Sequence, residues 1–518
     1  MPSLILEPHG VGEAHPPFDT LTEMFDHAVM EAPQTNALIQ DIRMLSYQKL
    51  DMAVRGMAGE LAAAGATGNT VGLLLPNGIG FTLAYFATLF AGGTPTLLNP
   101  AYPPAQLKPI LQDADPAILI STPQTGETLD ALSDIVGDAH RIILEASDPE
   151  MDAYIARSGS AGNLPRITPD TPAALLYTGG TTGVSKGVEH THAMLTDAVR
   201  AIDWVWPAKT SGEVRLPVAP MFHIYGFLTG VLNPVYDRCT VVIPDAFKPD
   251  HVVDLMARYK VTIFGGGPPA IYAALLNQSN FQGADLSALR VCPAGGAPFP
   301  VELIDRWRDA TGITIQEGYG MTEMAPISGN TEAFGSKPGT VGLAIPGCKV
   351  QIVDLEDKDK IMPADEKGEI RIAGPFAMTG YRNRPDETAK TIHDGFIYTG
   401  DIGVMDADGI VSITDRKKDV IIVNGFNVFP RDIEELVFTN PNVRNVGVIG
   451  MPDERAGERV VVFIVADHPE ETEAAIVTLC EDGLAPYQRP SDIRFVDDLP
   501  ITPANKLDRV ALREIAAG

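Results

Sequence analysis

The feature that most constrains the fold is a charge-free stretch from Leu61 to Leu107. A stretch of this length without charge has to be buried, either in a membrane or in a large protein core. A membrane helix needs about 20 uninterrupted apolar residues, and prolines and glycines interrupt this stretch at Pro76-Asn77-Gly78, Gly92-Gly93 and Pro95. We therefore expect a buried α/β core, with strands at 71–75 and 96–98 and a helix at 81–91.

Elsewhere the chain alternates short β-branched runs with amphipathic segments. The strand-like runs lie at 174–177, 241–243 and 261–264, and residues 251–259 place apolar side chains on one helical face. Strands that alternate with helices predict parallel sheets covered by helices. At one domain per ~150 residues, a chain of 518 residues contains more than one folding unit.

The pattern changes after residue 339. Short strand-like runs separated by turns predict a β-rich subdomain, and the part after Asp419 is typical of an α+β unit. The charged segment 414–419 between them predicts a solvated turn or a linker. The expected fold is α/β, with a large N-terminal domain of parallel-rich sheets packed with helices, a β-rich subdomain, and a small α+β C-terminal domain. The strand-like runs of the β-rich subdomain are 350–353, 368–372, 396–398 and 409–413. The α+β unit is expected to have strands at 420–423, 443–449 and 460–465 and helices at 430–439 and 471–481.

The charge balance limits the class of partner. Lys and Arg number 39 and Asp and Glu number 67, so the formal net charge is −28. Nucleic acids and anionic membrane surfaces are polyanions, which a chain of this charge repels. We expect small-molecule partners and no nucleic acid, and an anionic substrate would have to meet local cations. Peripheral membrane contact and oligomeric state stay open.

Cysteine spacing and the N-terminal segment bear on the compartment. Cys239, Cys292, Cys348 and Cys480 form no C-x-x-C pair, so a structural zinc site or a disulfide framework is not expected. The first residues lack a basic region followed by a long apolar region, so secretion is not indicated. We expect a cytoplasmic protein with reduced thiols.

The most informative segment is the loop Tyr177-Thr178-Gly179-Gly180-Thr181-Thr182-Gly183-Val184-Ser185-Lys186-Gly187. It combines glycines, threonine hydroxyls and a lysine in a turn that follows a predicted strand. Backbone N–H groups in such a turn can converge on phosphate oxygens, and hydroxyls and an ammonium add donors. The loop is not G-x-x-x-x-G-K-[ST], because Ser185 precedes the lysine and Gly187 follows it. The segment predicts a phosphate-binding loop of another kind.

The loop resembles the phosphate-binding motif of the adenylate-forming superfamily, which includes acyl-CoA synthetases, nonribosomal adenylation domains and luciferases. Further segments resemble this family's motifs in the same order, so the resemblance covers residues 20 to 515 or nearly so. They are Pro220-Met221-Phe222-His223-Ile224-Tyr225-Gly226, Gly318-Tyr319-Gly320-Met321-Thr322-Glu323, Tyr398-Thr399-Gly400-Asp401, Asp415-Arg416-Lys417-Lys418-Asp419 with Gly425-Phe426-Asn427, and Pro503-Ala504-Asn505-Lys506-Leu507-Asp508-Arg509.

The chain departs from the family pattern in the loop and near the last lysine. Many members have serine where this chain has Gly179, proline where it has Ser185, and glycine where it has Asn505. Asparagine tolerates left-handed backbone conformations better than most residues, so the turn before Lys506 is expected to persist. The form with Gly179 is similar to that of bacterial long-chain fatty-acyl-CoA ligases.

The resemblance implies an acid–CoA ligase that uses ATP, Mg²⁺ and coenzyme A. A carboxylate attacks the α-phosphorus of ATP to give an acyl-adenylate and pyrophosphate, and the CoA thiolate then displaces AMP. Thr178 and Glu323 would hold the metal, Asp401 would accept from both ribose hydroxyls, and Arg416 would donate to ribose or phosphate oxygens. The implied ATP and AMP residues are Thr178, Gly179, Gly180, Thr181, Thr182, Gly183, Lys186, Gly295, Gly296, Ala297, Gly318, Tyr319, Gly320, Met321, Thr322, Asp401, Arg416 and Lys506.

The expected catalytic residues are Lys506, His223, Thr178 and Glu323. The Lys506 ammonium would contact the substrate carboxylate and an α-phosphate oxygen and so cancel their repulsion. The thiol of the second step needs the place that Lys506 occupied, so the C-terminal domain should rotate. By resemblance the domains are 1–417 and 418–518, the hinge lies near Lys418, and Gly425 and Phe426 line the CoA channel.

The implied acyl pocket has no acidic or basic lining residue besides His223 at its edge. An amino acid substrate would need a carboxylate partner for its ammonium, so an apolar acid is favoured. Medium- or long-chain fatty acids come first, and aryl acids such as hydroxycinnamates or benzoates come second. An acyl-AMP ligase that serves a separate carrier protein, a non-catalytic nucleotide-binding relative and a luciferase-like oxygenase stay open. The pocket residues are Tyr225, Thr229, Gly265, Gly266, Gly267, Pro268, Gly295, Gly318, Gly320, Met321 and Ile327, with His223 beside them.

Overall fold

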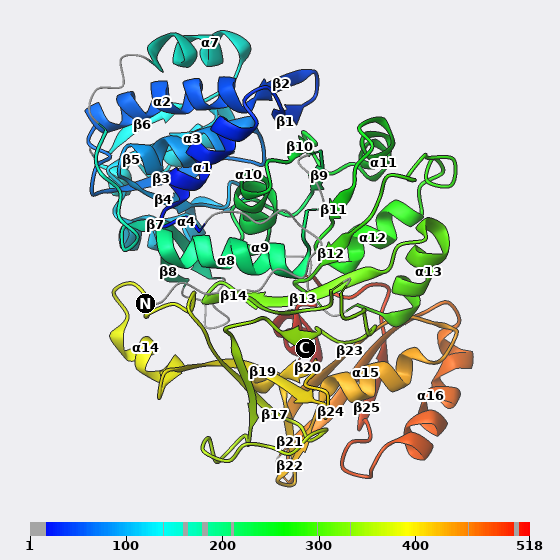
Figure 1. Ribbon diagram of the computed structural model, residues 1–518. Helices are drawn as coiled ribbons and strands as arrows, with labels where there is room; N and C mark the ends of the chain where they lie inside the picture. The colour runs from blue at the N-terminus through cyan, green and yellow to red at the C-terminus, as the bar shows by residue number, and fades with distance from the viewer. Residues whose placement is uncertain are drawn as a thin grey trace. The chain divides into compact units, whose positions relative to one another are not determined.

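The computed structural model describes residues 17–137, 139–158, 164–178, 185–208, 212–297, 299–331, 333–453, 455–501 and 507–517. They form two compact units, which we call the first and the second unit (Figure 1). The first unit is Met1–Val350 with Ile372–Ile397, and the second is Gln351–Arg371 with Tyr398–Gly518.

The first unit contains a six-stranded sheet of order β6-β5-β3-β4-β7-β8. Its strands are parallel except β8, which pairs antiparallel with β7 at one edge. The charge-free stretch supplies β3, α3 and β4, which confirms the buried strand–helix–strand prediction. The bounds are β3 Thr70–Leu74, α3 Ile79–Phe90, β4 Thr94–Leu97, β5 Ile118–Ser121, β6 His140–Ile143, β7 Pro172–Thr178 and β8 Lys186–Thr191.

A second sheet of the first unit has the order β11-β9-β10-β1-β2 and is parallel except for β2. The predicted parallel-rich sheets are therefore present. A third sheet, β12-β13-β14-β15, joins a parallel pair to an antiparallel hairpin. The bounds are β1 Asn36–Gln40, β2 Arg43–Ser46, β9 Val214–Pro217, β10 Thr240–Ile243, β11 Ile263–Gly265, β12 Cys292–Ala294, β13 Ile315–Met321, β14 Met324–Gly329 and β15 Leu343–Ala344.

Helices cover these sheets for reasons visible in the sequence. Every residue of α3 except Gly80 is buried, as expected for a helix packed on all sides. In α2, Gly56 marks the closest approach to a neighbour, because an added methyl group would lie 2.0 Å from the Tyr154 carbonyl oxygen. The helices are α1 Leu21–Glu31, α2 Tyr47–Ala63, α4 Pro104–Ala114, α5 Pro123–Asp130, α6 Ser133–Val136, α7 Asp148–Arg157, α8 His192–Val205, α9 Ile224–Phe227, α10 Asn233–Tyr236, α11 Pro249–Arg258, α12 Pro269–Leu276, α13 Val301–Thr311 and α14 Pro385–Thr391, with a π-helical turn at Leu228–Leu232.

The second unit has a sheet in which β16, β17, β19 and β20 follow one another, and a separate sheet of order β22-β21-β24-β23 with β25 on β24. Helices α15 and α16 share an apolar core with the latter sheet, around buried Val448, Val462 and Ile464. The bounds are β16 Lys349–Val353, β17 Gly368–Ala373, β19 Phe396–Met405, β20 Val411–Arg416, β21 Ile421–Val423, β22 Phe426–Val428, α15 Pro430–Phe438, β23 Val443–Asp453, β24 Gly457–Ala466, α16 Pro469–Gly483, β25 Asp492–Phe495 and α17 Arg509–Ala517. The short strand β18 Ile392–His393 belongs to the first unit.

The charged segment 414–419 differs from its predicted conformation. Residues 414–416 end strand β20, where Arg416 lies opposite Asp401, and residues 417–419 form a 3₁₀ turn. The turn prediction is wrong for 414–416, because cross-strand partners satisfy charges that the sequence alone presents as solvated. The predicted domain boundary at 417/418 lies within the second unit and stays a prediction.

No helix within the described ranges is long and apolar enough to span a bilayer.

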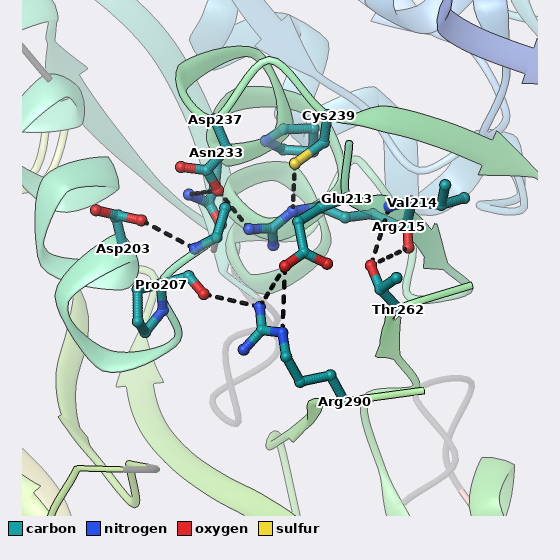
Figure 2. Close-up of polar contacts among 12 residues, drawn as sticks. Asp203, Pro207, Glu213, Val214, Arg215, Asn233, Asp237, Cys239, Thr262 and Arg290 are labelled. Atoms are coloured by element: carbon teal, nitrogen blue, oxygen red, sulfur yellow. Dashed lines mark hydrogen bonds and ion pairs between the residues drawn. The ribbon is translucent and has the colours of Figure 1, made fainter. Parts of the chain in front are cut away.

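A buried charge network fixes the strand that leads into the Pro220–Gly226 segment (Figure 2). The Arg215 guanidinium on β9 pairs with Asp237, and their side chains are 4% and 0% exposed. Asn233 Nδ2 donates to the same Asp237 oxygen at 3.0 Å, and Arg290 pairs with Glu213 at 2.9 Å. Burial, reinforced by the Asp237 charge, holds the pKa of Asp203 well above its ordinary value.

We predict that Asp237→Asn lowers the free energy of unfolding by about 3–5 kcal/mol, because it leaves the Arg215 charge buried without its carboxylate. Urea unfolding followed by circular dichroism measures the change. The control is Asp305→Asn, which removes the partner of Arg308 from an ion pair of 2.7 Å whose side chains are 44% and 45% exposed. Exposed pairs contribute about 0–1 kcal/mol, so equal losses in the two variants would contradict the prediction.

Candidate active site

The predicted phosphate loop connects the two edge strands of the six-stranded sheet. Thr178 ends β7 and lies opposite Lys186, which begins β8, so the hairpin holds both ends of the loop together. The Tyr177 hydroxyl donates to Asp113 at 2.7 Å and fixes the end of strand β7. The predicted ligands Gly179, Gly180, Thr181, Thr182 and Gly183 lie outside the described residues.

Lys186 is held by two groups on the segment 381–387. Its ammonium lies 2.7 Å from Glu387 Oε2 and 4.9 Å from the centre of the Tyr381 ring. The Lys186 side chain is 19% exposed and that of Glu387 is 33% exposed. The ammonium at the start of β8 therefore has a carboxylate partner and an aromatic neighbour.

Glu323, the predicted magnesium ligand, is buried in the turn between β13 and β14. Its Oε1 accepts a hydrogen bond of 2.6 Å from the Tyr381 hydroxyl. Burial, followed by the Glu323 charge, raises the pKa of Tyr381 well above its ordinary value, so this phenol stays a donor. The Glu323 backbone carbonyl accepts from the Met378 amide at 2.8 Å, which fixes the turn.

Magnesium fits the donor chemistry of these residues. The ion prefers hard oxygen ligands and keeps several waters, so one or two carboxylates with substrate phosphates are enough. Glu323 supplies one carboxylate and Thr178 one hydroxyl. When bound, the ion would neutralise phosphate charge.

The hairpin and the Glu323 turn are tied together by a buried histidine. His190 on β8 donates from Nε2 to the Thr322 carbonyl at 2.9 Å. Val188 forms a β-bridge with Tyr381, and the Arg382 amide donates to the Gly187 carbonyl at 2.8 Å. The two described ends of the predicted phosphate loop, Thr178 and Lys186, thus share one hydrogen-bonded frame with Glu323.

The predicted adenine segments meet through backbone. Gly295 follows β12, and a methyl group added to it would lie 2.9 Å from the Gly318 carbonyl oxygen on β13. Gly296 has φ +85 and open space around its missing side chain, and Ala297 is half-buried. Tyr319, Gly320, Met321 and Thr322 continue along the hairpin that ends at Glu323. Gly295 is therefore required by the approach of Gly318, whereas Gly296 borders open space.

The predicted acyl residues gather around Tyr225. A methyl group added at Gly267 or at Gly295 would lie 3.9 Å from the Tyr225 ring. The Tyr225 hydroxyl donates to the Pro293 carbonyl at 3.0 Å, and the Thr229 hydroxyl donates to the Tyr225 carbonyl at 2.7 Å. The ring is therefore fixed, and its polar atom is already bound.

Some of the predicted wall glycines pack against protein instead. A methyl group at Gly266 would lie 2.6 Å from Tyr272, one at Gly318 would lie 2.8 Å from Trp206, and one at Gly320 would lie 3.0 Å from Ala325. These glycines admit neighbouring side chains, so they shape the site indirectly. Gly265 ends β11, Pro268 precedes α12, and Ile327 is fully buried on β14.

His223 precedes helix α9, and its exposed imidazole lies against Phe222 with ring centres 4.8 Å apart. The backbone beside it is fixed by Asn77, whose side chain donates to the Ala219 carbonyl at 2.9 Å and accepts from the Met221 amide at 2.7 Å. The catalytic role of His223 stays a prediction.

The second unit brings together the predicted ribose residues. Arg416 Nε lies 2.7 Å from Asp401 Oδ1, and the Asp401 side chain is 5% exposed. Burial lowers the pKa of Lys418 in the adjoining 3₁₀ turn. Gly425 has φ +82, and Phe426 stacks on Tyr487 at 4.6 Å. Lys506 lies outside the described residues.

Several residues that build the site carry no sequence signal of their own. Tyr381, His190, Trp206 and Asn77 act through contacts with residues far away in the chain. Asn77 stood out only as part of a strand-ending turn, and Tyr381 did not stand out at all. A regular strand pattern through β8 could have placed His190 on the buried face.

We predict that His190 makes the protein less stable in acid. Burial lowers the pKa of His190 from its ordinary 6.5 to about 4, so below pH 6.5 the unfolded chain binds a proton that the folded chain excludes. Stability is therefore lost as the pH falls from 6.5 towards 4, by about 3 kcal/mol over the interval. His190→Gln keeps an N–H donor for Thr322 and should lose less stability than wild type between pH 7 and 4.5.

Urea midpoints at the two pH values measure this effect, and exposed His251 on α11 provides the control variant His251→Gln. Buried His192, whose pKa burial also lowers to about 4, accounts for the part of the loss that remains. An unchanged pH dependence in His190→Gln would overturn the assignment.

Comparison with known proteins identifies the family. The AMP-binding enzyme family matches residues 25–382, and its C-terminal domain matches residues 432–506. A long-chain-fatty-acid–CoA ligase of Escherichia coli is 31% identical over 97% of this chain and 95% of its own length. A 4-coumarate–CoA ligase-like protein of Oryza sativa is 32% identical over 92% and 88%, respectively. The crystal structure of ATP-bound MatB from Rhodopseudomonas palustris is 30% identical, with a TM-score of 0.87 over 95% of this chain and 98% of that one. The chain belongs to the AMP-binding enzyme family and is an AMP-forming acyl-CoA synthetase.

Proposed function

We propose that this synthetase activates a medium- or long-chain fatty acid. The observation that carries the proposal is that the described residues against the Tyr225 ring and hydroxyl, Gly267, Gly295 and Pro293, carry no charge. A substrate ammonium would find no carboxylate among these residues, whereas an alkyl chain needs none. The relatives named long-chain-fatty-acid–CoA ligase support the same class.

An aryl acid is the second candidate. The fixed Tyr225 ring offers an aromatic face to a flat substrate, and a relative named 4-coumarate–CoA ligase-like supports this reading. The two classes differ in the depth of the site that they require, so activity against matched acids separates them.

The first half-reaction brings a carboxylate against a polyanion, so cations have to lie where negative charge accumulates. In this proposal Lys186 and the loop amides hold the β- and γ-phosphates, and Thr178 and Glu323 hold magnesium. Asp401 accepts from the ribose hydroxyls, and Arg416 donates to ribose or phosphate oxygens. Lys506 contacts both the substrate carboxylate and the α-phosphate, while His223 orients the carboxylate or gates its entry.

The second half-reaction requires the CoA thiol to replace Lys506, and we propose rotation about Lys418 with Gly425 and Phe426 lining the channel. Within the second unit, such a rotation has to break contacts that cross the 417/418 boundary. Lys367 lies 2.7 Å from Asp432, and Asp415 accepts from the Arg431 amide at 3.0 Å. The Lys367–Asp432 pair is partly exposed, so it opposes the rotation only weakly.

The proposed location is the cytoplasm, where ATP and CoA are available. All four cysteines are free, which suits a reducing compartment.

We predict that AMP release is fastest with fatty acids of medium or long chain. The experiment measures CoA-dependent AMP and pyrophosphate release by the full-length enzyme with ATP and Mg²⁺, for acids of increasing chain length, hydroxycinnamates, benzoates and amino acids. The expected kcat/KM rises about tenfold for every two methylene groups buried, at ~0.8 kcal/mol each.

Other outcomes have definite meanings. A maximum with hydroxycinnamates or benzoates would replace the fatty-acid proposal with the aryl alternative. Adenylate formation that CoA does not convert to thioester would instead favour an acyl-AMP ligase with a separate carrier protein.

We predict that Lys506→Ala abolishes acyl-adenylate formation and leaves thioester formation from supplied acyl-adenylate largely intact. The reason is that its ammonium offsets repulsion only in the first half-reaction. Single-turnover assays of each half-reaction measure the split, and the control for removal of a positive charge is Arg444→Ala, whose side chain is 59% exposed on the second unit. Equal loss in both half-reactions would refute the role.

A further inference from the structure

Lys186 has an anionic partner within the chain. Its ammonium lies 2.7 Å from Glu387 Oε2, and the other oxygen of Glu387 lies 2.8 Å from Lys390 Nζ. Glu387 belongs to α14, so this carboxylate is presented to the hairpin by a helix far from the phosphate loop in the sequence.

A carboxylate and a phosphate compete for the same ammonium. Both present anionic oxygens that accept charge-assisted hydrogen bonds of similar length. The Tyr381 ring, 4.9 Å from the ammonium, occupies another side of it. Phosphate oxygens that approach Lys186 must therefore either displace Glu387 or share the cation with it, against the repulsion of its negative charge.

We propose that Glu387 is a positioning residue that stands in for the triphosphate. It holds Lys186 at the loop mouth before ATP binds, gives the ammonium up to the β- and γ-phosphates, and takes it back as pyrophosphate leaves. This inference rests on the proposed function, in which Lys186 binds those phosphates.

The surroundings of Glu387 suit such an exchange. When Lys186 leaves, Lys390 stays beside the carboxylate, so the negative charge is never left without a cation. The two lysines, Lys186 first, lower the pKa of Glu387 to about 2, so the carboxylate is ionised at neutral pH and the exchange needs no proton transfer. The pair is also partly exposed, which keeps its energy small enough for a bound nucleotide to overcome.

The alternative is a static ion pair that only fastens α14 to β8. The two readings differ in a measurable way, because AMP lacks the β- and γ-phosphates. If Glu387 stands in for the triphosphate, its removal changes the affinity for ATP and pyrophosphate and leaves the affinity for AMP unchanged. If the pair only fastens α14 to β8, its removal lowers the stability of the protein and changes the affinities for ATP and AMP equally.

The test is Glu387→Gln in the full-length enzyme, which removes the charge and keeps the shape. We expect the Kd values of ATP and of pyrophosphate, measured by calorimetry with Mg²⁺ and without acid substrate, to fall about three- to fivefold, as expected for loss of a partly exposed ion pair. The Kd of AMP should stay unchanged. In turnover, the KM for ATP should fall and pyrophosphate should inhibit more strongly, while kcat should stay unchanged.

The matched control is Asp386→Asn, which removes the same charge from an exposed neighbour on the same helix. It should leave all three Kd values unchanged, and an effect equal to that of Glu387→Gln would show that only long-range charge matters. Unchanged or weaker ATP binding by Glu387→Gln, or equal shifts for ATP and AMP, would overturn the proposal. Thermal unfolding verifies that both variants are folded.

Lys186→Met separates this inference from the proposed function. If Lys186→Met weakens ATP binding and Glu387→Gln has no effect on it, the phosphate role of Lys186 holds and the stand-in role of Glu387 is wrong. If Lys186→Met leaves ATP binding unchanged, the assignment of Lys186 in the proposed function fails as well. In the Lys186→Met background, Glu387→Gln should lose most of its effect, which a double-mutant cycle measures.

Discussion

The proposed nucleotide site depends on the position in which the Lys186 ammonium is held, because a chain of net charge −28 has to bind a polyanion. Long-range repulsion from the whole chain is screened beyond about 10 Å at 0.1 M salt, so a few cations at close range can dominate. That makes their positions decisive. The β7–β8 hairpin, His190 and Tyr381 fix Lys186 and Glu323 in one frame of backbone and buried side chains.

The parts of the fold that could be predicted are those with local signals in the sequence. The strand at Thr70–Leu74, the helix at Ile79–Phe90 and the strand at Thr94–Leu97 begin and end within two residues of their predicted bounds. Apolar runs interrupted by proline and glycine are short-range patterns, so the sequence contains them directly. The predicted phosphate loop has an equally local signal, because glycines, hydroxyls and a lysine are concentrated in one segment, and its role stays a prediction.

The parts that could not be predicted depend on contacts between distant residues. The Tyr381 hydroxyl and Glu323 are 58 positions apart, and no periodicity relates a phenol on one segment to a carboxylate in the turn of another. The turn prediction for 414–416 failed for the same reason, since the strand opposite supplies Asp401 for Arg416 at 2.7 Å. Charge in a sequence indicates solvation only when no partner is available, and partners are a property of the fold.

The two ion pairs at predicted nucleotide-binding cations differ in what nucleotide binding demands of them. Arg416 is paired with Asp401, which is itself a proposed ribose ligand, so nucleotide can add to this pair without breaking it. Lys186 is paired with Glu387, which has no proposed contact with nucleotide, so in the proposed exchange this pair opens. An acidic chain can hold both cations in place with carboxylates, but in this proposal only the second pair couples the release of the cation to the arrival of phosphate. Pyrophosphate leaves between the half-reactions while AMP stays until the second, so the proposed exchange places a reversible contact at the phosphates that leave and a persistent one at the ribose that remains.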